Sequence, residues 1–177
     1  MKNCLNLGSG ADIKMTNINK KWTNLDILKL KGVDVVHNLN KFPYPFKNNE
    51  FDEVYTSHCL EHLDDLVKVM NELKRICKNG AKIIIRVPHF SCGVSYRDPT
   101  HKRLFSYFTF DYFTDECFYE LPKFNIVKRQ LNFTRLAFTP LNNLFNPIIN
   151  INPSIYERFF CWILPCAECL FILEVLK

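Results

Sequence analysis

The sequence has little glycine and no long apolar run, and both absences narrow the class of protein. Only 5 of its 177 residues are glycine, against 9 prolines, which excludes a low-complexity linker or a fibrous chain. The most apolar stretch, residues 159–173, contains Pro165 and Glu168 and is shorter than the roughly 20 residues that span a membrane. We therefore expect a globular domain in which residues 159–173 form a core helix and a core strand, with a peripheral membrane contact as the alternative.

A dense cluster of basic residues is also missing. The net charge is +5, from 23 Lys and Arg and 18 Asp and Glu. A dedicated nucleic-acid-binding domain more often carries a concentrated basic stripe. We therefore expect no nucleic-acid partner.

The eight cysteines lack the paired spacing of a disulfide framework. No secretory signal is visible, because Gly8 and Asp12 interrupt the early apolar residues. We therefore expect reduced thiols and a cytoplasmic protein.

The spacing of Cys161, Cys166 and Cys169 matches three ligands of a plant-type iron–sulfur site, but the segment is bulky and lacks glycine. Buried free thiols are the better interpretation.

Apolar segments separated by turns predict an α/β fold. One helix is expected over residues 63–80, ended by Asn79-Gly80, and another over residues 105–121. Residues 41–50 read as a turn, and residues 135–158 as irregular. Strands are expected at residues 3–7, 22–27, 33–39, 51–57, 81–88, 124–134 and 168–177. The early connections are too short for full helices, although a parallel pair usually needs a dozen residues or more, so we expect extended loops there.

A glycine turn and a later acid suggest a nucleotide site. Gly8 and Gly10 follow the first strand, where glycine lets backbone N–H groups approach a ligand. Asp26 ends the second strand, where a carboxylate can bind both ribose hydroxyls. A purely structural turn and a surface acid are the alternatives. The third glycine of G-x-G-x-x-G is absent, which disfavours a nucleotide-sugar oxidoreductase.

Residues 58–62 read H-x-x-E-H, the inverted zinc-protease motif. On a helix, His58 and His62 could hold a metal ion, with Glu61 as a base. The motif has no evident third ligand, so we expect no metal site and keep a zinc-dependent hydrolase as an alternative. A third possibility is that His62 caps or packs against the start of a helix.

Five segments in order resemble the successive motifs of class I S-adenosylmethionine-dependent methyltransferases: LNLGSG, WTNLDI, VDVVHNL, FPYPFKNNEFDEVYTSHCLEHL and LKRICKNGAKIIIRVP. The likeness is closest to small bacterial and archaeal methyltransferase-domain proteins (type 11-like), often found near glycan genes. It implies one domain over residues 1–177, with a Rossmann-like, mostly parallel sheet and an antiparallel final strand. Residues 1–90 would be the cofactor-binding half and residues 91–177 the acceptor side.

The resemblance implies S-adenosylmethionine as cofactor and assigns roles to matching residues. Asp26 would bind the ribose, and Asn38 would face the adenine amino group with Leu39 beside it. Asn6 and Asn38 stand where the family often has acids, which keeps a non-catalytic, methyltransferase-like binding domain as an alternative. The rest of the cofactor would lie against the glycine turn and the end of the fourth strand, at Asn6, Gly8, Ser9, Gly10, Ser57 and His58.

Methyl transfer is an in-line displacement in which the protein positions the acceptor and excludes water. We expect a small-molecule or saccharide acceptor, methylated at oxygen with the help of a base. His101 is the first candidate, in a polar turn that should be reachable by a substrate, with Asp98 orienting it. His89 and Tyr96 are further candidates after the fifth strand. A turn that caps the next helix is the alternative for residues 98–101.

Overall fold

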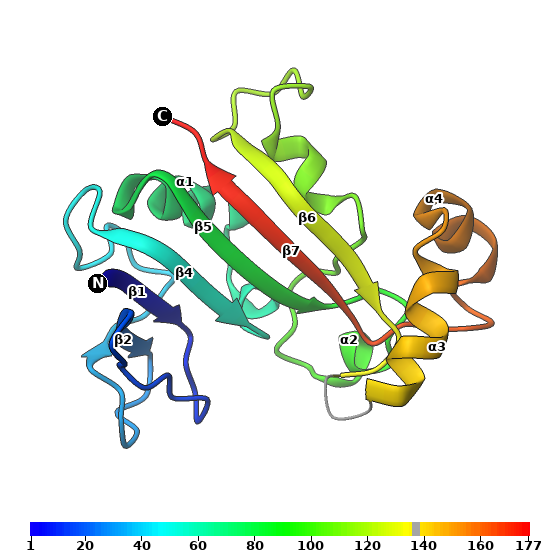
Figure 1. Ribbon diagram of the computed structural model, residues 1–177, viewed down its shortest axis with the longest axis horizontal. Coiled ribbons are helices and arrows are strands. Elements are labelled where there is room, and N and C mark those ends of the chain that lie inside the picture. The colour runs from blue at the N-terminus through cyan, green and yellow to red at the C-terminus, as the bar shows by residue number, and fades with distance from the viewer. Residues whose placement is uncertain (136–138) are drawn as a thin grey trace.

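The computed structural model describes residues 1–135 and 139–177 and contains one seven-stranded sheet (Figure 1). The strand order is β3-β2-β1-β4-β5-β7-β6; β1 to β5 pair in parallel, and β7 is antiparallel to β5 and β6. This confirms the predicted mostly parallel sheet with an antiparallel final strand. The strands are β1 Lys2–Leu7, β2 Lys20–Asp26, β3 Val35–Val36, β4 Phe51–Ser57, β5 Cys77–Pro88, β6 Phe124–Asn132 and β7 Glu168–Val175.

The connections from β1 to β2 and from β2 to β3 contain no helix in this described part of the chain, as predicted. Polar side chains organise these loops instead. The side-chain oxygen of Asn24 accepts hydrogen bonds from the backbone N–H of Lys14 (2.9 Å) and from the amide of Asn6 (3.0 Å). The backbone N–H of Asn24 donates to Asp34 (2.7 Å). A buried asparagine thus holds these loops in place through hydrogen bonds.

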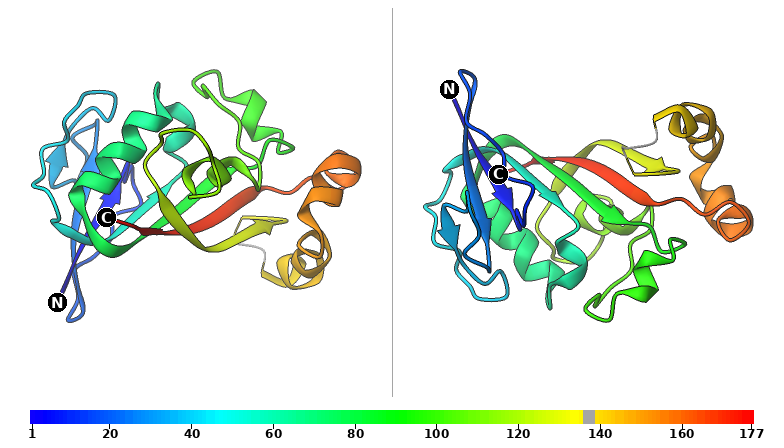
Figure 2. Two further views of the ribbon diagram at one scale, coloured as in Figure 1. Left: turned by 90° about the horizontal axis from the view of Figure 1, so that it is seen from above. Right: turned by 90° about the horizontal axis from the view of Figure 1, so that it is seen from below.

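Helix α1, Leu66–Ile76, is capped by Asp65, whose side chain accepts from the backbone N–H of Lys68. The predicted helix over residues 63–80 is therefore real but shorter at both ends. Asn79-Gly80 does not cap it; these residues lie within β5, where Gly80 has φ +75°. Figure 2 shows α1 packed on one face of the sheet, and this face contains the main core.

The opposite face of the sheet is largely uncovered, and Figure 1 looks onto it. Along β5, Ile83 and Ile85 are buried, whereas Ile84 and Arg86 are half-buried. The expected strand over residues 81–88, which is apolar enough to be buried on both faces, is therefore fully buried on one face only. The physical reason is the absence of the two early crossover helices, which would otherwise cover the second face.

Two predictions for the second half of the chain are wrong. Residues 105–121 form a 3₁₀ turn at Thr109–Phe113 rather than a helix, because aromatic side chains such as Phe110 pack directly on the sheet. Residues expected to be irregular form helix α3, Thr139–Ile149, and the short α4, Pro153–Ile155. A short helix α2, Val94–Arg97, was not expected.

Residues 159–173 divide into an exposed and a buried part. Strand β7 lies in the core, as expected, but Phe159, Trp162 and Ile163 are 60%, 64% and 80% exposed, so the expected core helix is wrong. The three cysteines of this region, Cys161, Cys166 and Cys169, are buried and free, which confirms the expectation of buried free thiols. Within the described residues, no helix has the length and apolar character to cross a membrane. A peripheral contact through the exposed side chains stays a prediction.

Candidate functional site

A pocket of about 340 Å³ opens at the carboxyl ends of β1, β2 and β4. The strand order reverses around β1, and ligands of open α/β sheets bind at such a switch point. Six of the nine predicted cofactor residues line the pocket: Gly8, Gly10, Asp26, Asn38, Leu39 and His58. Five further lining residues were not in that set: Ile27, Asn40, Cys59, His62 and Leu63.

Asp26 and the glycine turn form one connected unit. The carboxylate of Asp26 accepts hydrogen bonds from the backbone N–H of Gly10 (2.8 Å) and of Leu28 (2.9 Å), one on each oxygen. A carboxylate has about four acceptor positions, so each oxygen can accept a further bond from a ligand hydroxyl. Gly8 and Gly10 have φ values of +68° and +48°, which favour glycine.

The far side of the pocket combines an amide with apolar side chains. The side-chain oxygen of Asn38 accepts from the backbone N–H of Asn40 (2.9 Å), which holds the amide in place. Leu39 is buried, and Ile27 is 58% exposed at the rim. The sequence analysis did not single out Ile27, because only the structure shows that this isoleucine after the acid of β2 is exposed at the pocket rim.

Three predicted cofactor residues do not line this pocket in the described structure. The amide of Asn6 donates to the backbone oxygen of Asp12 (2.7 Å) and to Asn24 (3.0 Å), so its contacts are structural. Ser9 is 4% exposed, and its backbone N–H donates to the carbonyl of Leu25. Ser57 ends β4, one residue before His58.

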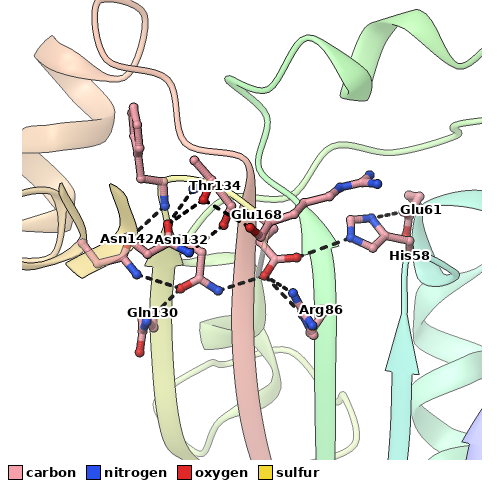
Figure 3. Close-up of polar contacts among 11 residues, drawn as sticks. His58, Glu61, Arg86, Gln130, Asn132, Thr134, Asn142 and Glu168 are labelled. Carbon is pink, nitrogen blue, oxygen red and sulfur yellow. Dashed lines mark hydrogen bonds and ion pairs between the residues drawn. The ribbon is translucent and has the colours of Figure 1, made fainter. Parts of the chain in front are cut away.

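His58 has φ +51° and lies between two buried carboxylates (Figure 3). Its Nδ1 is 3.4 Å from Glu61, and its Nε2 is 3.4 Å from Glu168. Glu168 also accepts from Arg86 (2.5 Å) and Asn132 (2.9 Å). Burial opposes a charge on His58, but its contacts with Glu168 and Glu61 outweigh burial and raise its pKa. In Glu168, the bonds from His58, Arg86 and Asn132 outweigh burial and lower the pKa.

His62 is a second imidazole that lines the pocket, and a hydrogen-bond chain orients it. The hydroxyl of Thr100 donates to Asp98 (2.6 Å), so its oxygen can accept from Nδ1 of His62 (2.9 Å). This assigns the proton of the neutral ring to Nδ1 and leaves Nε2 with a lone pair. The sequence motif contained His62, but only the fold adds Thr100 and Asp98.

His101 lies behind His62 rather than in the open turn that we expected. Its ring contacts the ring of His62, with centroids 4.7 Å apart, and its side chain is only 6% exposed. Its Nε2 is 3.8 Å from Asp98, and its Nδ1 is 3.3 Å from the backbone oxygen of Ser95. His101 is absent from the described lining of the pocket. A substrate in the pocket therefore meets His62 first.

His89 is fully buried and part of a structural network. Its Nδ1 lies 2.7 Å from the hydroxyl of Ser91, and its Nε2 lies 3.1 Å from Glu157. Tyr96 is 57% exposed and, like His89, is not among the described lining residues. Neither residue is placed to contact a ligand in this pocket.

The H-x-x-E-H segment is not on an α-helix. Leu60–His62 is a 3₁₀ turn, and α1 begins only at Leu66. His58 and His62 therefore do not share the helical face that the zinc-hydrolase alternative requires, because the left-handed backbone at His58 turns its ring toward Glu168. Cys59, between them, has its pKa raised to about 12 by burial and by Glu61, so it is a neutral thiol.

Comparison with known proteins agrees with this architecture. Residues 4–85 match the family described as methyltransferase domain. A demethylmenaquinone methyltransferase from Bacillus cereus is 31% identical over 75 residues, which are 42% of this chain. The match spans only 31% of the length of that relative, so the chain matches less than a third of it.

Solved structures resemble nearly the whole chain. A SAM-dependent methyltransferase from Archaeoglobus fulgidus covers 98% of this chain and 86% of its own, with a TM-score of 0.65 and 17% identity. A phosphoethanolamine N-methyltransferase 2 from Haemonchus contortus, solved with phosphomonomethylethanolamine and S-adenosylhomocysteine, covers 99% of this chain and 49% of its own. Its TM-score is 0.59 at 14% identity. At these identities the likeness establishes the fold.

Proposed function

We propose that this chain, whose residues 4–85 match the methyltransferase-domain family, transfers the methyl group of S-adenosylmethionine to a small-molecule or saccharide acceptor. The observation that carries the proposal is the position of Asp26. Its carboxylate is held by the N–H of Gly10 at the tip of β2 and borders a pocket of about 340 Å³. Both oxygens retain acceptor capacity for a pair of ribose hydroxyls.

The remaining lining residues support one orientation of the cofactor. The adenine would lie between Ile27 and Leu39, with its amino group donating to the oxygen of Asn38. The methionine part would pass the backbone of Gly8 and Gly10 toward His58. The sulfonium methyl would then point to the side of the pocket formed by His62 and Leu63.

The chain's own residues have two tasks in the reaction. The first is to place the acceptor in line with the methyl–sulfur bond and to exclude water. The second, for a hydroxyl acceptor, is to remove a proton. The Nε2 of His62 can accept it, because Thr100 holds Nδ1 and Asp98 holds Thr100. His101, which the sequence suggested as the base, would act here through its contact with His62.

The alternative is a methyltransferase-like domain that binds no cofactor. Its support in the sequence is that Asn6 and Asn38 stand where the family often has acids. Asn6 makes structural bonds beside β1 and β2, so its difference from the family acid removes no contact that lines this pocket. Asn38 still presents an amide to the pocket. Both details favour a cofactor-binding protein.

Isothermal titration calorimetry with S-adenosylhomocysteine tests the proposal directly. We expect saturable binding at one site per chain, weakened by Asp26→Ala. Absence of heat with the folded wild-type protein would reject it. With binding established, sugars, phenols and small hydroxy acids can be screened as acceptors by transfer of a labelled methyl group.

A further inference from the structure

Glu61 is completely buried, and neither carboxylate oxygen receives a hydrogen bond from a described residue. Its one ion-pair contact within the described chain is the long, 3.4 Å approach of His58. A buried carboxylate without hydrogen bonds is costly unless a cation compensates it. A second group is therefore expected at this carboxylate.

Two imidazoles lie next to Glu61. Glu61, His62 and His101 each offer one ligand atom, and these three atoms lie within 4.8 Å of one another. Zinc bonds to nitrogen and oxygen are about 2.0–2.2 Å long and tetrahedral, so neighbouring ligand atoms lie roughly 3.4 Å apart. Rotation of these side chains toward one another would close the set around one ion. The H-x-x-E-H segment lacked a third ligand in the sequence, and the fold supplies His101.

The two segments that carry these side chains are fastened together. The backbone N–H of Lys102 donates to the carbonyl of Glu61 (2.8 Å), and Arg103 donates to the carbonyl of Leu63 (2.6 Å). Thr100 and Asp98 orient His62, as the hydrogen-bonded partners of metal-binding histidines commonly do. The cluster is therefore held in place before any ion binds.

We propose that Glu61, His62 and His101 bind a divalent transition-metal ion beside the cofactor pocket. Two imidazoles and one carboxylate suit zinc, cobalt, manganese or iron(II) rather than calcium or magnesium, which prefer oxygen ligands. Since Nδ1 of His62 is engaged by Thr100, its ligand atom is Nε2. Three protein ligands leave positions open for an exogenous molecule.

The consequence for the reaction rests on the proposed function. His62 lines the pocket, so an ion on Nε2 would be accessible to an acceptor there. Coordination to the ion would lower the pKa of an acceptor hydroxyl, whose proton would pass to water, so the ion would replace free imidazole as the activating group. The acceptor class would be molecules with two adjacent oxygens, such as a vicinal diol or a hydroxy acid, which can occupy two open positions.

Titration of EDTA-treated, dialysed protein with Co²⁺ tests the site, because the visible spectrum of Co²⁺ reports nitrogen and oxygen coordination. We expect one equivalent to bind. Glu61→Gln and His101→Ala should each weaken binding by more than the roughly 10–100-fold typical of losing an outer partner, and Thr100→Val by about that amount. His37→Ala, in a histidine outside the cluster, is the matched control.

Absence of stoichiometric Co²⁺ binding to folded wild-type protein would overturn the proposal. Unchanged spectra and affinity in both Glu61→Gln and His101→Ala would place the ion elsewhere and would also overturn it. Circular dichroism and S-adenosylhomocysteine calorimetry on the same samples separate the two proposals. Intact cofactor binding without metal binding rejects only the metal site, whereas metal binding without cofactor binding rejects only the methyltransferase function.

Discussion

A Cβ atom on Gly8 would lie 2.8 Å from Cβ of Cys59 and closer still to its sulfur, so the first turn of the pocket and the segment after β4 share one space. Gly8 also has φ +68°, which side chains rarely adopt. Gly8→Ala should lower the free energy of unfolding by roughly 1–3 kcal/mol, since both overpacking and backbone strain act at this position. Urea denaturation measures the loss.

Gly10→Ala is the matched control for this effect. Gly10 has φ +48°, but a Cβ there would meet nothing within 4 Å. Its cost should be limited to backbone strain, about 1–2 kcal/mol. If the two variants were equally stable, steric contact with Cys59 would not matter.

Asp26→Ala should weaken S-adenosylhomocysteine binding by about 1.5–3 kcal/mol, the usual range for hydrogen bonds to a charged group. The control is Asp12→Ala, which removes an acid of the adjacent loop whose side chain is 59% exposed and pairs with Lys14. Calorimetry should show near wild-type affinity for the control. An unchanged dissociation constant for Asp26→Ala would remove this residue from the cofactor site.

Glu157 links the C-terminal segment to the loop before the 3₁₀ turn at Thr109–Phe113. It should make the free energy of unfolding depend on pH. It accepts from His89 (3.1 Å), Ser106 (2.7 Å) and the backbone N–H of Tyr107 (2.6 Å). Burial alone would raise its pKa, but these three bonds outweigh burial and lower the pKa below the reference value of 4.5. Its stabilisation is therefore complete above pH 4.5 and is lost as the pH falls through the folded-state pKa.

Glu157→Gln should cost about 1–3 kcal/mol of unfolding free energy at pH 7, and the difference from wild type should shrink toward acid pH. Urea denaturation between pH 7 and pH 3.5 measures both effects. Glu120→Gln, at an exposed acid, should change neither. A constant difference across this pH range would contradict the assignment to the carboxylate charge.

His62→Ala should lower the methylation rate by roughly 10²–10⁴-fold on an acceptor found by screening, while S-adenosylhomocysteine still binds. We expect a comparable loss for His101→Ala, because both rings serve the proposed metal site. The His37→Ala variant should keep full activity. A large loss in His62→Ala beside a normal rate in His101→Ala would favour a free imidazole base over a metal ion.

The first half of the chain could be predicted closely because its signals are local. The glycine turn at Gly8 and Gly10, the acid at the end of β2, and the strand of residues 51–57 are each readable from adjacent residues. The second half was predicted less well, since residues 105–121 are aromatic without a helical period and pack onto the sheet instead. The exposed Trp162 was also misjudged, because apolar character alone does not reveal which side of a segment is covered.

The sequence by itself determined the α/β class, the mostly parallel sheet implied by its motif succession, and the position of Asp26, because alternation, turns and capping depend on neighbouring residues. Only the tertiary structure decided which side chains gather around Glu61 and His62. It brings His101 and Thr100 of one loop onto Glu61 and His62 of another, across 38 to 40 positions of chain. Contacts at that separation depend on how β4 and β5 are paired and on the route of the chain after β5, which no local pattern of residues records.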